Sequence, residues 1–166
     1  MVMTTSAAGD AEMVPREALT FRLGAEEYAI DILHVQEIRS YERPTRIANA
    51  PAHLLGVTNL RGDIVPIVDL RIRFGLDAGY NSATVVVVLN IGRRTVGAVV
   101  DSVSDVQALA RGDVKAVPDI GNGIESRQIV GLACVRHGER ERMLILLNIE
   151  PLLGNVDVGL PEELAA

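Results

Sequence analysis

The sequence predicts an all-β fold, either a barrel or a sandwich. Short apolar segments of strand length recur along the 166 residues, with turn residues between them and few helix signals. The composition is 48% hydrophobic but only 3% aromatic, with no Trp, so Val, Leu, Ile and Ala must build the core. A chain of this length holds one domain, or two small units that share a core.

A β-hairpin is expected where ordered structure begins. Residues 1–17 are small, polar and acidic and are expected to form a mobile N-terminal tail. Apolar and polar side chains then alternate over residues 19–23, as in a half-buried strand. After a turn at residues 24–27, the alternation resumes at residues 28–32, which are the expected hairpin partner.

One helix and several further strands are expected next. Asn49 as cap, Pro51 in the first turn and Gly56 as stop signal predict a short helix over residues 49–56. Gly92 and Gly138 mark two tight hairpins. Strand patterns occupy residues 64–70, 84–90, 94–100, 129–135 and 142–149.

The apolar run over residues 64–70 has an unusual beginning and an unusual middle. It follows the polar turn residues 59–63, which include Arg61, and Pro66 interrupts it. Proline cannot donate to a sheet ladder, so it marks an edge, a bulge or a strand start. The segment therefore predicts a buried strand with one unpaired edge and an Arg at its mouth, where another protein could dock.

A weak internal repeat relates residues 24–38 to residues 92–106 without a gap. The aligned pairs are Gly24 with Gly92, Tyr28 with Val96, Val35 with Val103, Glu37 with Asp105, and Ile38 with Val106. Two such β units, each too small to bury a full core alone, would pack together and leave a groove at their seam. Chance similarity between Val-rich strands explains the alignment equally well.

The segment around Glu37 suggests a docking patch. If residues 35–39 are extended, Val35, Glu37 and Arg39 share one face, and Gln36 and Ile38 share the other. Ile38 is the better core candidate, which would leave Val35 exposed beside two charges. The alternative is a half-buried Val35 at a sheet margin.

Charge and cysteine content argue against several classes of protein. The net charge is -6 and Lys115 is the only lysine, which disfavours nucleic-acid binding. Cys134 is the only cysteine, so there is no internal disulfide, and a reducing compartment is indicated. Residues 1–17 lack the apolar run of a signal peptide, and no segment is long and apolar enough for a membrane span. These features predict a cytoplasmic protein.

The sequence offers little support for catalysis. His34, His53 and His137 stand apart from any nucleophile or metal ligand at a useful spacing, and no glycine-rich phosphate loop is present. Asp101 and Asp105 are interpreted as solvent-facing turn residues rather than an acid–base pair. We therefore predict no catalytic residues, metal or cofactor, with a small hydrolase or transferase on a β-barrel as the alternative class.

Three long segments carry a specific family resemblance. "LGAEEYAIDILHVQEIRSYERPTRIANAPAHLLGVTNLRGDIVPIVDLRIRF", "TVVVVLNIGRRTVGAVVDSVSDV" and "RMLILLNIEPLL" resemble the CheW-like family of bacterial chemotaxis coupling proteins. The resemblance covers residues 18–154 and leaves 155–166 as a C-terminal tail. It implies two packed SH3-like five-stranded β-barrel subdomains that share a hydrophobic core, with short helices.

The resemblance also implies a function. Such proteins are non-catalytic adaptors that couple the cytoplasmic tips of chemoreceptors to the regulatory domain of the histidine kinase CheA. The chain should then be a cytoplasmic monomer in isolation, recruited to membrane-associated receptor arrays, with neither membrane insertion nor nucleic-acid binding. Service in a related pathway, controlling pili or development, is the alternative within this class.

The family's functional positions map onto three groups of residues. The receptor-binding groove corresponds to Val35, Val85, Val103 and Val106. Receptor and kinase coupling corresponds to Glu37, Gly56 and Arg61, with Glu37 and Arg61 expected to pair at the rim of the groove. Kinase binding corresponds to Ile64, Asp119 and Ile120, where Ile120 replaces an aromatic residue found in some relatives.

Overall fold

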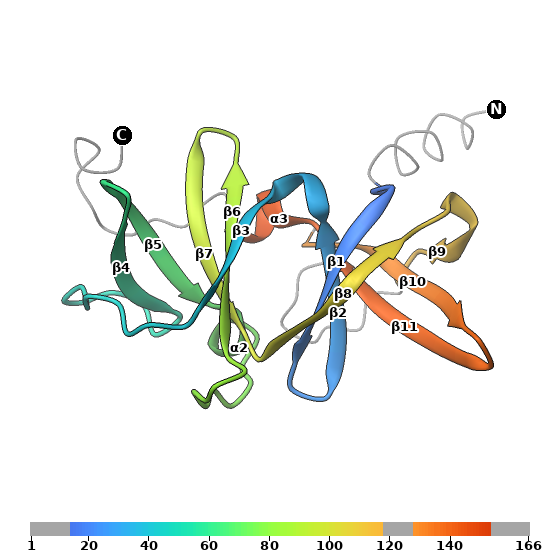
Figure 1. The fold of residues 1–166 in the computed structure, drawn as a ribbon, viewed down its shortest axis with the longest axis horizontal. Coiled ribbons are helices and arrows are strands. Elements are labelled where there is room, and N and C mark those ends of the chain that lie inside the picture. The colour runs from blue at the N-terminus through green and yellow to red at the C-terminus, as the bar shows by residue number, and fades with distance from the viewer. Residues whose placement is uncertain (1–13, 118–127, 154–166) are drawn as a thin grey trace.

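Two β-sheets form the molecule, lying next to each other along its long axis (Figure 1). The computed structural model describes residues 14–117 and 128–153. The first sheet has the order β8-β1-β2-β11-β10-β9. Its strands are β1 (Glu17–Leu23), β2 (Glu26–Asp31), β8 (Ser102–Ala108), β9 (Val114–Lys115), β10 (Ile129–His137) and β11 (Arg140–Leu147).

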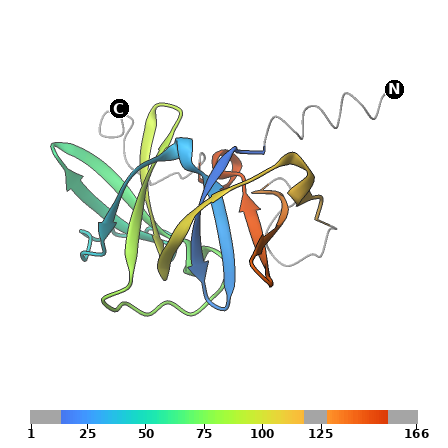
Figure 2. The same cartoon turned by 45° about the vertical axis from the view of Figure 1, so that its right-hand side comes forward.

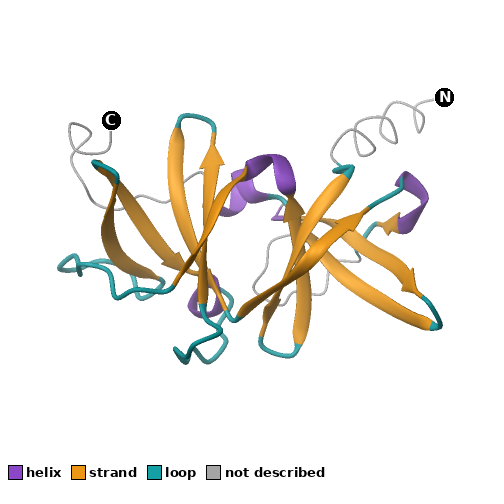
Figure 3. Ribbon diagram, in the orientation of Figure 1, coloured by secondary structure: helices purple, strands orange, loops and turns teal. Residues whose placement is uncertain are grey.

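The second sheet has the order β3-β6-β7-β5-β4. Its strands are β3 (Val35–Ser40), β4 (Leu54–Leu60), β5 (Asp63–Asp69), β6 (Val85–Ile91) and β7 (Arg94–Val100). The helices are short and lie at strand ends (Figure 3): η1 (Ile32–His34), α2 (Leu70–Arg73), η2 (Arg111–Asp113) and α3 (Ile149–Leu153). No helix in the described part of the chain is long and apolar enough to cross a membrane.

The two sheets share one wiring pattern. Each has a central hairpin, β1–β2 or β6–β7, followed by a parallel neighbour, β11 or β5, from a second hairpin. All other strands of each sheet come from the other half of the chain; on the outer side of each central hairpin, β3 leaves β2 to pair with β6, and β8 leaves β7 to pair with β1 (Figures 1 and 2). The turns of both central hairpins contain a left-handed glycine, Gly24 and Gly92. The topology therefore supports the internal repeat.

The described residues form three apolar clusters, and the largest belongs to both sheets. We call this largest cluster the shared core: Leu19, Phe21, Leu23, Tyr28, Ile30, Leu54, Val68, Leu70, Val87, Leu89, Ile91, Val96, Ala98, Val100, Leu147, Ile149, Leu152 and Leu153. A second cluster lies within the first sheet and includes Leu144 and Leu146. A third lies within the second sheet and includes Leu60 and Val65. The predicted all-β fold, with two β units around a common core, is confirmed. The two-residue strand β9 adds a sixth strand to the first sheet.

The prediction of a helix over residues 49–56 is wrong. Asn49 has a φ of 63° and is not a helix cap, and strand β4 already begins at Leu54. Thr45 and Val57 exchange backbone hydrogen bonds of 2.9 and 2.8 Å, which hold the preceding loop along the outer edge of β4. The sequence pattern does not predict strands β8 and β9 either.

Pro66 lies where β5 has only one neighbour. It is opposite Val57 of β4, whereas the parallel ladder to β7 starts one residue later, at Ile67. The first half of β5 therefore has an unpaired edge, as the proline predicts.

Candidate functional site

The β4–β5 turn presents Arg61 at the tip of a hairpin. Leu60 and Asp63 pair across the turn, and both central residues have positive φ, 53° at Arg61 and 95° at Gly62. This combination is typical of a type I′ turn, whose twist matches that of the flanking strands. Asn59 Oδ1 accepts a hydrogen bond of 2.8 Å from the Gly62 amide, which fixes the turn.

Arg61 joins two strands that lie at opposite edges of the second sheet. Its Nη2 donates to Oε2 of Glu37 at 2.6 Å. Glu37 is on β3 and Arg61 directly follows β4, and β3 and β4 are the outermost strands of this sheet. The structure therefore brings Glu37 and Arg61 together, and their contact connects the two outermost strands of the sheet.

The second oxygen of Glu37 is poorly satisfied. Glu37 Oε1 is inaccessible to solvent and has no hydrogen-bond partner among the described residues, while Arg39 Nη1 lies 3.5 Å away. The Glu37 side chain as a whole is 25% exposed, and that of Arg61 is 62% exposed. A desolvated acceptor costs stability, so stability alone does not explain this arrangement.

The four valines are divided between the two sheets. Val35 and Val85 lie on the β3–β6 ladder, at its opposite ends, while Val103 and Val106 lie on β8. Each is directly opposite a member of the shared core: Leu89, Val100, Phe21 and Leu19, respectively. Residues paired in this way share a sheet face, so all four valines are on the faces that enclose the shared core.

Exposure differs among these valines. Val35, Val85 and Val103 are half-buried and pack against the shared core, whereas Val106 is 47% exposed. Both β3 and β8 are edge strands, each paired on one side only. Val35, Val103 and Val106 therefore lie on the two edge strands at the margin of the shared core, and Val85 lies on β6 beside β3.

The expected orientation of Ile38 is wrong. A register shift between Val35 and Glu37 places Val35 opposite Leu89 and Ile38 opposite Val87, both in the shared core. A bulge inserts one residue, so Ile38 moves to the same face as Val35 instead of the opposite one. Ile38 is not buried but 44% exposed, and it adds to the apolar margin of β3. The sequence contained no signal for the bulge.

The remaining predicted positions differ in accessibility. Gly56 is buried within β4, and a Cβ at this position would lie 2.0 Å from the Thr45 carbonyl oxygen. Ile64 is 46% exposed near the start of β5. Asp119 and Ile120 lie outside the described residues.

The interpretation of Asp101 and Asp105 as solvent-facing turn residues is wrong for Asp105, which lies in a strand, and is right for Asp101 only in its position between two strands, since both carboxylates form ion pairs. Asp105 is in strand β8 and accepts hydrogen bonds of 3.0 and 3.2 Å from Arg142. Asp101 is the single residue between β7 and β8 and accepts a hydrogen bond of 2.8 Å from Arg71. The sequence could not reveal their arginine partners, which come from distant segments.

The polar groups of the described residues do not gather into a metal site. No cluster of three or more His, Cys, Asp or Glu side chains suited to a metal ion occurs among them. His34 Nδ1 is 3.1 Å from the carbonyl oxygen of Asn90, a local backbone contact. Burial and the nearby charge of Arg73 lower the pKa of His53. Neither described histidine has a nucleophile among its hydrogen-bond partners.

Comparisons with known proteins agree on one family. The CheW-like domain family matches residues 17–157. "Chemotaxis protein CheW" of Klebsiella aerogenes is 48% identical over 155 residues, which are 93% of this chain and 91% of that protein. "Chemotaxis protein CheW" of Rhizobium meliloti is 35% identical over 136 residues, covering 81% and 85%. The crystal structure of scaffolding protein TtCheW from Thermoanaerobacter tengcongensis superimposes with a TM-score of 0.74 at 27% identity, covering 84% of this chain and 88% of that one.

Proposed function

This chain belongs to the CheW-like domain family, and we propose that it is a non-catalytic chemotaxis scaffold that couples the cytoplasmic tips of chemoreceptors to the histidine kinase CheA. In this proposal it acts in the cytoplasm and is recruited to membrane-associated receptor arrays. It binds the kinase through the kinase's regulatory domain and needs no cofactor.

The observation that carries the proposal is the apolar margin between the two sheets. Strands β3 and β8 belong to different sheets, are both unpaired on one side, and both place valines beside the shared core. An amphipathic helix that lays its apolar face into such a margin is a common mode of recognition. A receptor tip is helical, and Val35, Val85, Val103 and Val106 are the side chains proposed to receive it.

The Glu37–Arg61 pair would orient the docked partner. An exposed ion pair contributes only about 0–1 kcal/mol to stability, so a role in recognition accounts for this pair better than stabilisation does.

A second surface is proposed for the kinase. Ile64 is an exposed apolar residue on the same hairpin as Arg61, away from the valines on β8. Asp119 and Ile120 are proposed as a further kinase contact. The hairpin tip would thus lie between the two partners, which suits a residue that couples them.

Two exposed apolar residues with nearly equal accessibility allow the two surfaces to be separated. Val106 is 47% exposed and Ile64 is 46% exposed. We expect Val106→Asp to abolish binding of a receptor-tip fragment, since docking would bury an unpaired charge at a cost of about 3–5 kcal/mol. Binding of the kinase's regulatory domain should be unchanged. Ile64→Asp should give the reverse result.

Both variants should keep the melting temperature of the wild type within a few degrees, because each new carboxylate can stay hydrated in the free protein. Affinities for the two fragments would be measured by calorimetry, with an assay for hydrolysis or group transfer run on the wild type. Equal loss of both partners in Val106→Asp, or its unfolding, would show that Val106 is ordinary core. A turnover of substrate by the wild type would contradict the non-catalytic role.

A further inference from the structure

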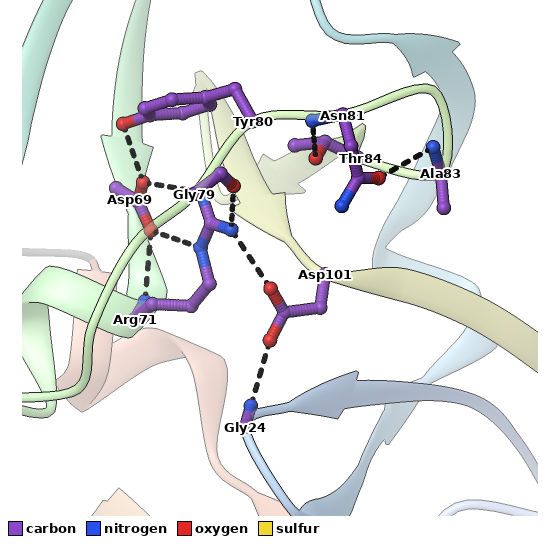
Figure 4. A network of polar contacts seen from close by, with 9 residues as sticks. All are labelled: Gly24, Asp69, Arg71, Gly79, Tyr80, Asn81, Ala83, Thr84 and Asp101. Atoms are coloured by element: carbon purple, nitrogen blue, oxygen red, sulfur yellow. Dashed lines mark hydrogen bonds and ion pairs between the residues drawn. The ribbon is translucent and has the colours of Figure 1, made fainter.

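The chain passes between the two sheets at Asp101, and the carboxylate of this residue is held from both sides (Figure 4). Asp101 Oδ1 accepts a hydrogen bond of 2.8 Å from Nη1 of Arg71, which is in α2 directly after β5 of the second sheet. Asp101 Oδ2 accepts one of 2.7 Å from the backbone amide of Gly24, in the β1–β2 turn of the first sheet. One carboxylate therefore connects a group from each sheet.

Arg71 is a rigid anchor for this connection. Its side chain and that of Asp69 are both fully buried. Arg71 Nε and Nη2 donate to the two oxygens of Asp69 at 3.0 and 2.9 Å, and Nη1 donates to the carbonyl oxygen of Gly79 as well as to Asp101. With the guanidinium engaged on every side, it cannot turn toward another partner.

Tyr80 covers the anchor. Its hydroxyl donates to Asp69 Oδ2 at 2.9 Å, and its ring centroid lies 5.0 Å from Arg71 Cζ. Burial lowers the pKa of Arg71, but hydrogen bonds and attraction from Asp69 and Asp101 outweigh burial and raise it above its usual value. Burial and the hydrogen bond to Asp69 raise the pKa of Tyr80 to about 12. Arg71 therefore stays charged and Tyr80 stays neutral across the neutral range.

The position of Asp101 determines where β8 leaves the second sheet. Val100, the residue before it, is the last of β7 and lies opposite Val85. Ser102, the residue after it, begins β8, and Val103 follows opposite Phe21 of the first sheet. A rotation about Asp101 would therefore change the distance between Val85 and Val103 while leaving each sheet intact.

We propose that Asp101 is a positioning residue that sets the angle between the two sheets, and thereby the spacing of Val35 and Val85 relative to Val103 and Val106. The importance of the valine spacing rests on the proposed receptor-docking function, whereas the effect of Asp101 on the angle does not.

Asp105, four residues further along the chain in β8, provides a matched control. The side chains of Asp101 and Asp105 are 36% and 40% exposed, and each is paired with one arginine. Asp105, however, accepts hydrogen bonds from Thr20 on β1 and Arg142 on β11, which are both in the first sheet. A change at Asp105 therefore removes a comparable ion pair whose two members both belong to the first sheet.

The test compares Asp101→Asn with Asp105→Asn in the full chain. Asparagine has one acceptor oxygen, so its amide group must face either Arg71 or the Gly24 amide, and one of the two links breaks. Residual dipolar couplings of backbone amides report the orientation of each sheet. For the wild type and Asp105→Asn, we expect one alignment tensor to fit the couplings of both sheets to the structure. For Asp101→Asn, we expect each sheet to need its own alignment tensor.

Binding gives the second readout. Asp101→Asn should weaken the affinity for a receptor-tip fragment by about tenfold, the scale of one lost hydrogen bond to a charged group. Asp101→Glu keeps the charge but lengthens the side chain, so it should shift the angle between the sheets without loosening it, and it serves if Asp101→Asn does not fold.

If one alignment tensor fitted both sheets in both Asp101 variants, as in the wild type, the positioning role would be overturned. Separate alignments with an unchanged affinity for the receptor tip would overturn the link between the angle and docking. Failure of the wild type to bind the receptor tip would instead refute the proposed function, and the alignment result would still decide the role of Asp101.

Discussion

Arg61 combines two structural tasks that a single side chain rarely has. Its backbone occupies the left-handed region that a type I′ turn requires, and its side chain spans to Glu37 on the other edge of the sheet. A non-glycine residue in this region is uncommon. The turn could use a residue with less strain at this position, so the guanidinium itself is what the position needs.

We expect Arg61→Ala to keep the fold and to lose coupling. Alanine meets the same backbone strain as arginine, and the exposed ion pair contributes only about 0–1 kcal/mol. Urea unfolding would measure stability, and receptor-dependent control of kinase activity in a reconstituted complex would measure coupling. Arg39→Ala is the control, because Arg39 also approaches Glu37 but at 3.5 Å and without a hydrogen bond.

Arg39→Ala should leave both stability and coupling close to wild type. If Arg61→Ala instead lowers the free energy of unfolding by well over 1 kcal/mol, Arg61 closes the barrel as a structural element and is not primarily a coupling residue. Equal loss of coupling in the two variants would mean that net charge near Glu37 matters, and not the specific pair.

Single residues also show what sequence reading could and could not predict. The pairing of Glu37 with Arg61 followed from the resemblance, and the structure places them 2.6 Å apart. The face of Ile38 did not follow, because strict alternation assumes an unbroken register and the β3 bulge shifts it by one residue. Ion pairs of Asp101 and Asp105 were equally invisible, since their arginine partners are at least 30 residues away.

Among the elements, β4 shows most clearly how a tertiary contact overrides local signals. The residues around Asn49, Pro51 and Gly56 punctuate a helix by every local criterion. The chain instead uses Gly56 to let the Thr45 backbone approach the edge of β4, with a φ of 149° that few other residues adopt. This contact covers the outer edge of the second sheet, which would otherwise be open to pairing with another chain.

We expect Gly56→Ala to destabilise the protein by roughly 2–4 kcal/mol, because the new methyl group overlaps the Thr45 backbone and the φ becomes strained. Thermal and urea unfolding would measure the loss. The control is Gly112→Ala in η2, where a Cβ meets nothing within 4 Å and which should change stability by no more than about 0.5 kcal/mol.

This result would also classify the role of Gly56 in coupling. A destabilised Gly56→Ala should lose the receptor and the kinase together, since the whole hairpin that carries Arg61 and Ile64 depends on β4. A variant with wild-type stability that loses only one partner would mean that Gly56 is itself a contact residue.

At the scale of the whole molecule, the exchange of strands matters more than the number of strands. Each central hairpin takes its third strand from the other half of the chain, and both sheets contribute to the shared core. The gap-free alignment of residues 24–38 with 92–106 identified equivalent segments correctly. It could not show that those segments pair across the halves, because equivalence within a repeat does not specify which strand is the neighbour.

Strand exchange and the shared core together predict that the two sheets unfold as one cooperative unit. Leu60 and Leu144 are suitable probes, since each is at most 5% exposed and each lies in a cluster that belongs to only one sheet. Replacing either leucine with alanine should lower the free energy of unfolding by about 2–5 kcal/mol. Native-state amide exchange should then show the same decrease in protection for the slowest amides of both sheets, because those amides exchange only through global unfolding.

Two independent units would behave differently: Leu60→Ala would lower protection in the second sheet alone, and Leu144→Ala only in the first sheet. A partner that docks between β3 and β8 would in the cooperative case stabilise every strand of the molecule at once, since its binding energy would add to a single unfolding equilibrium.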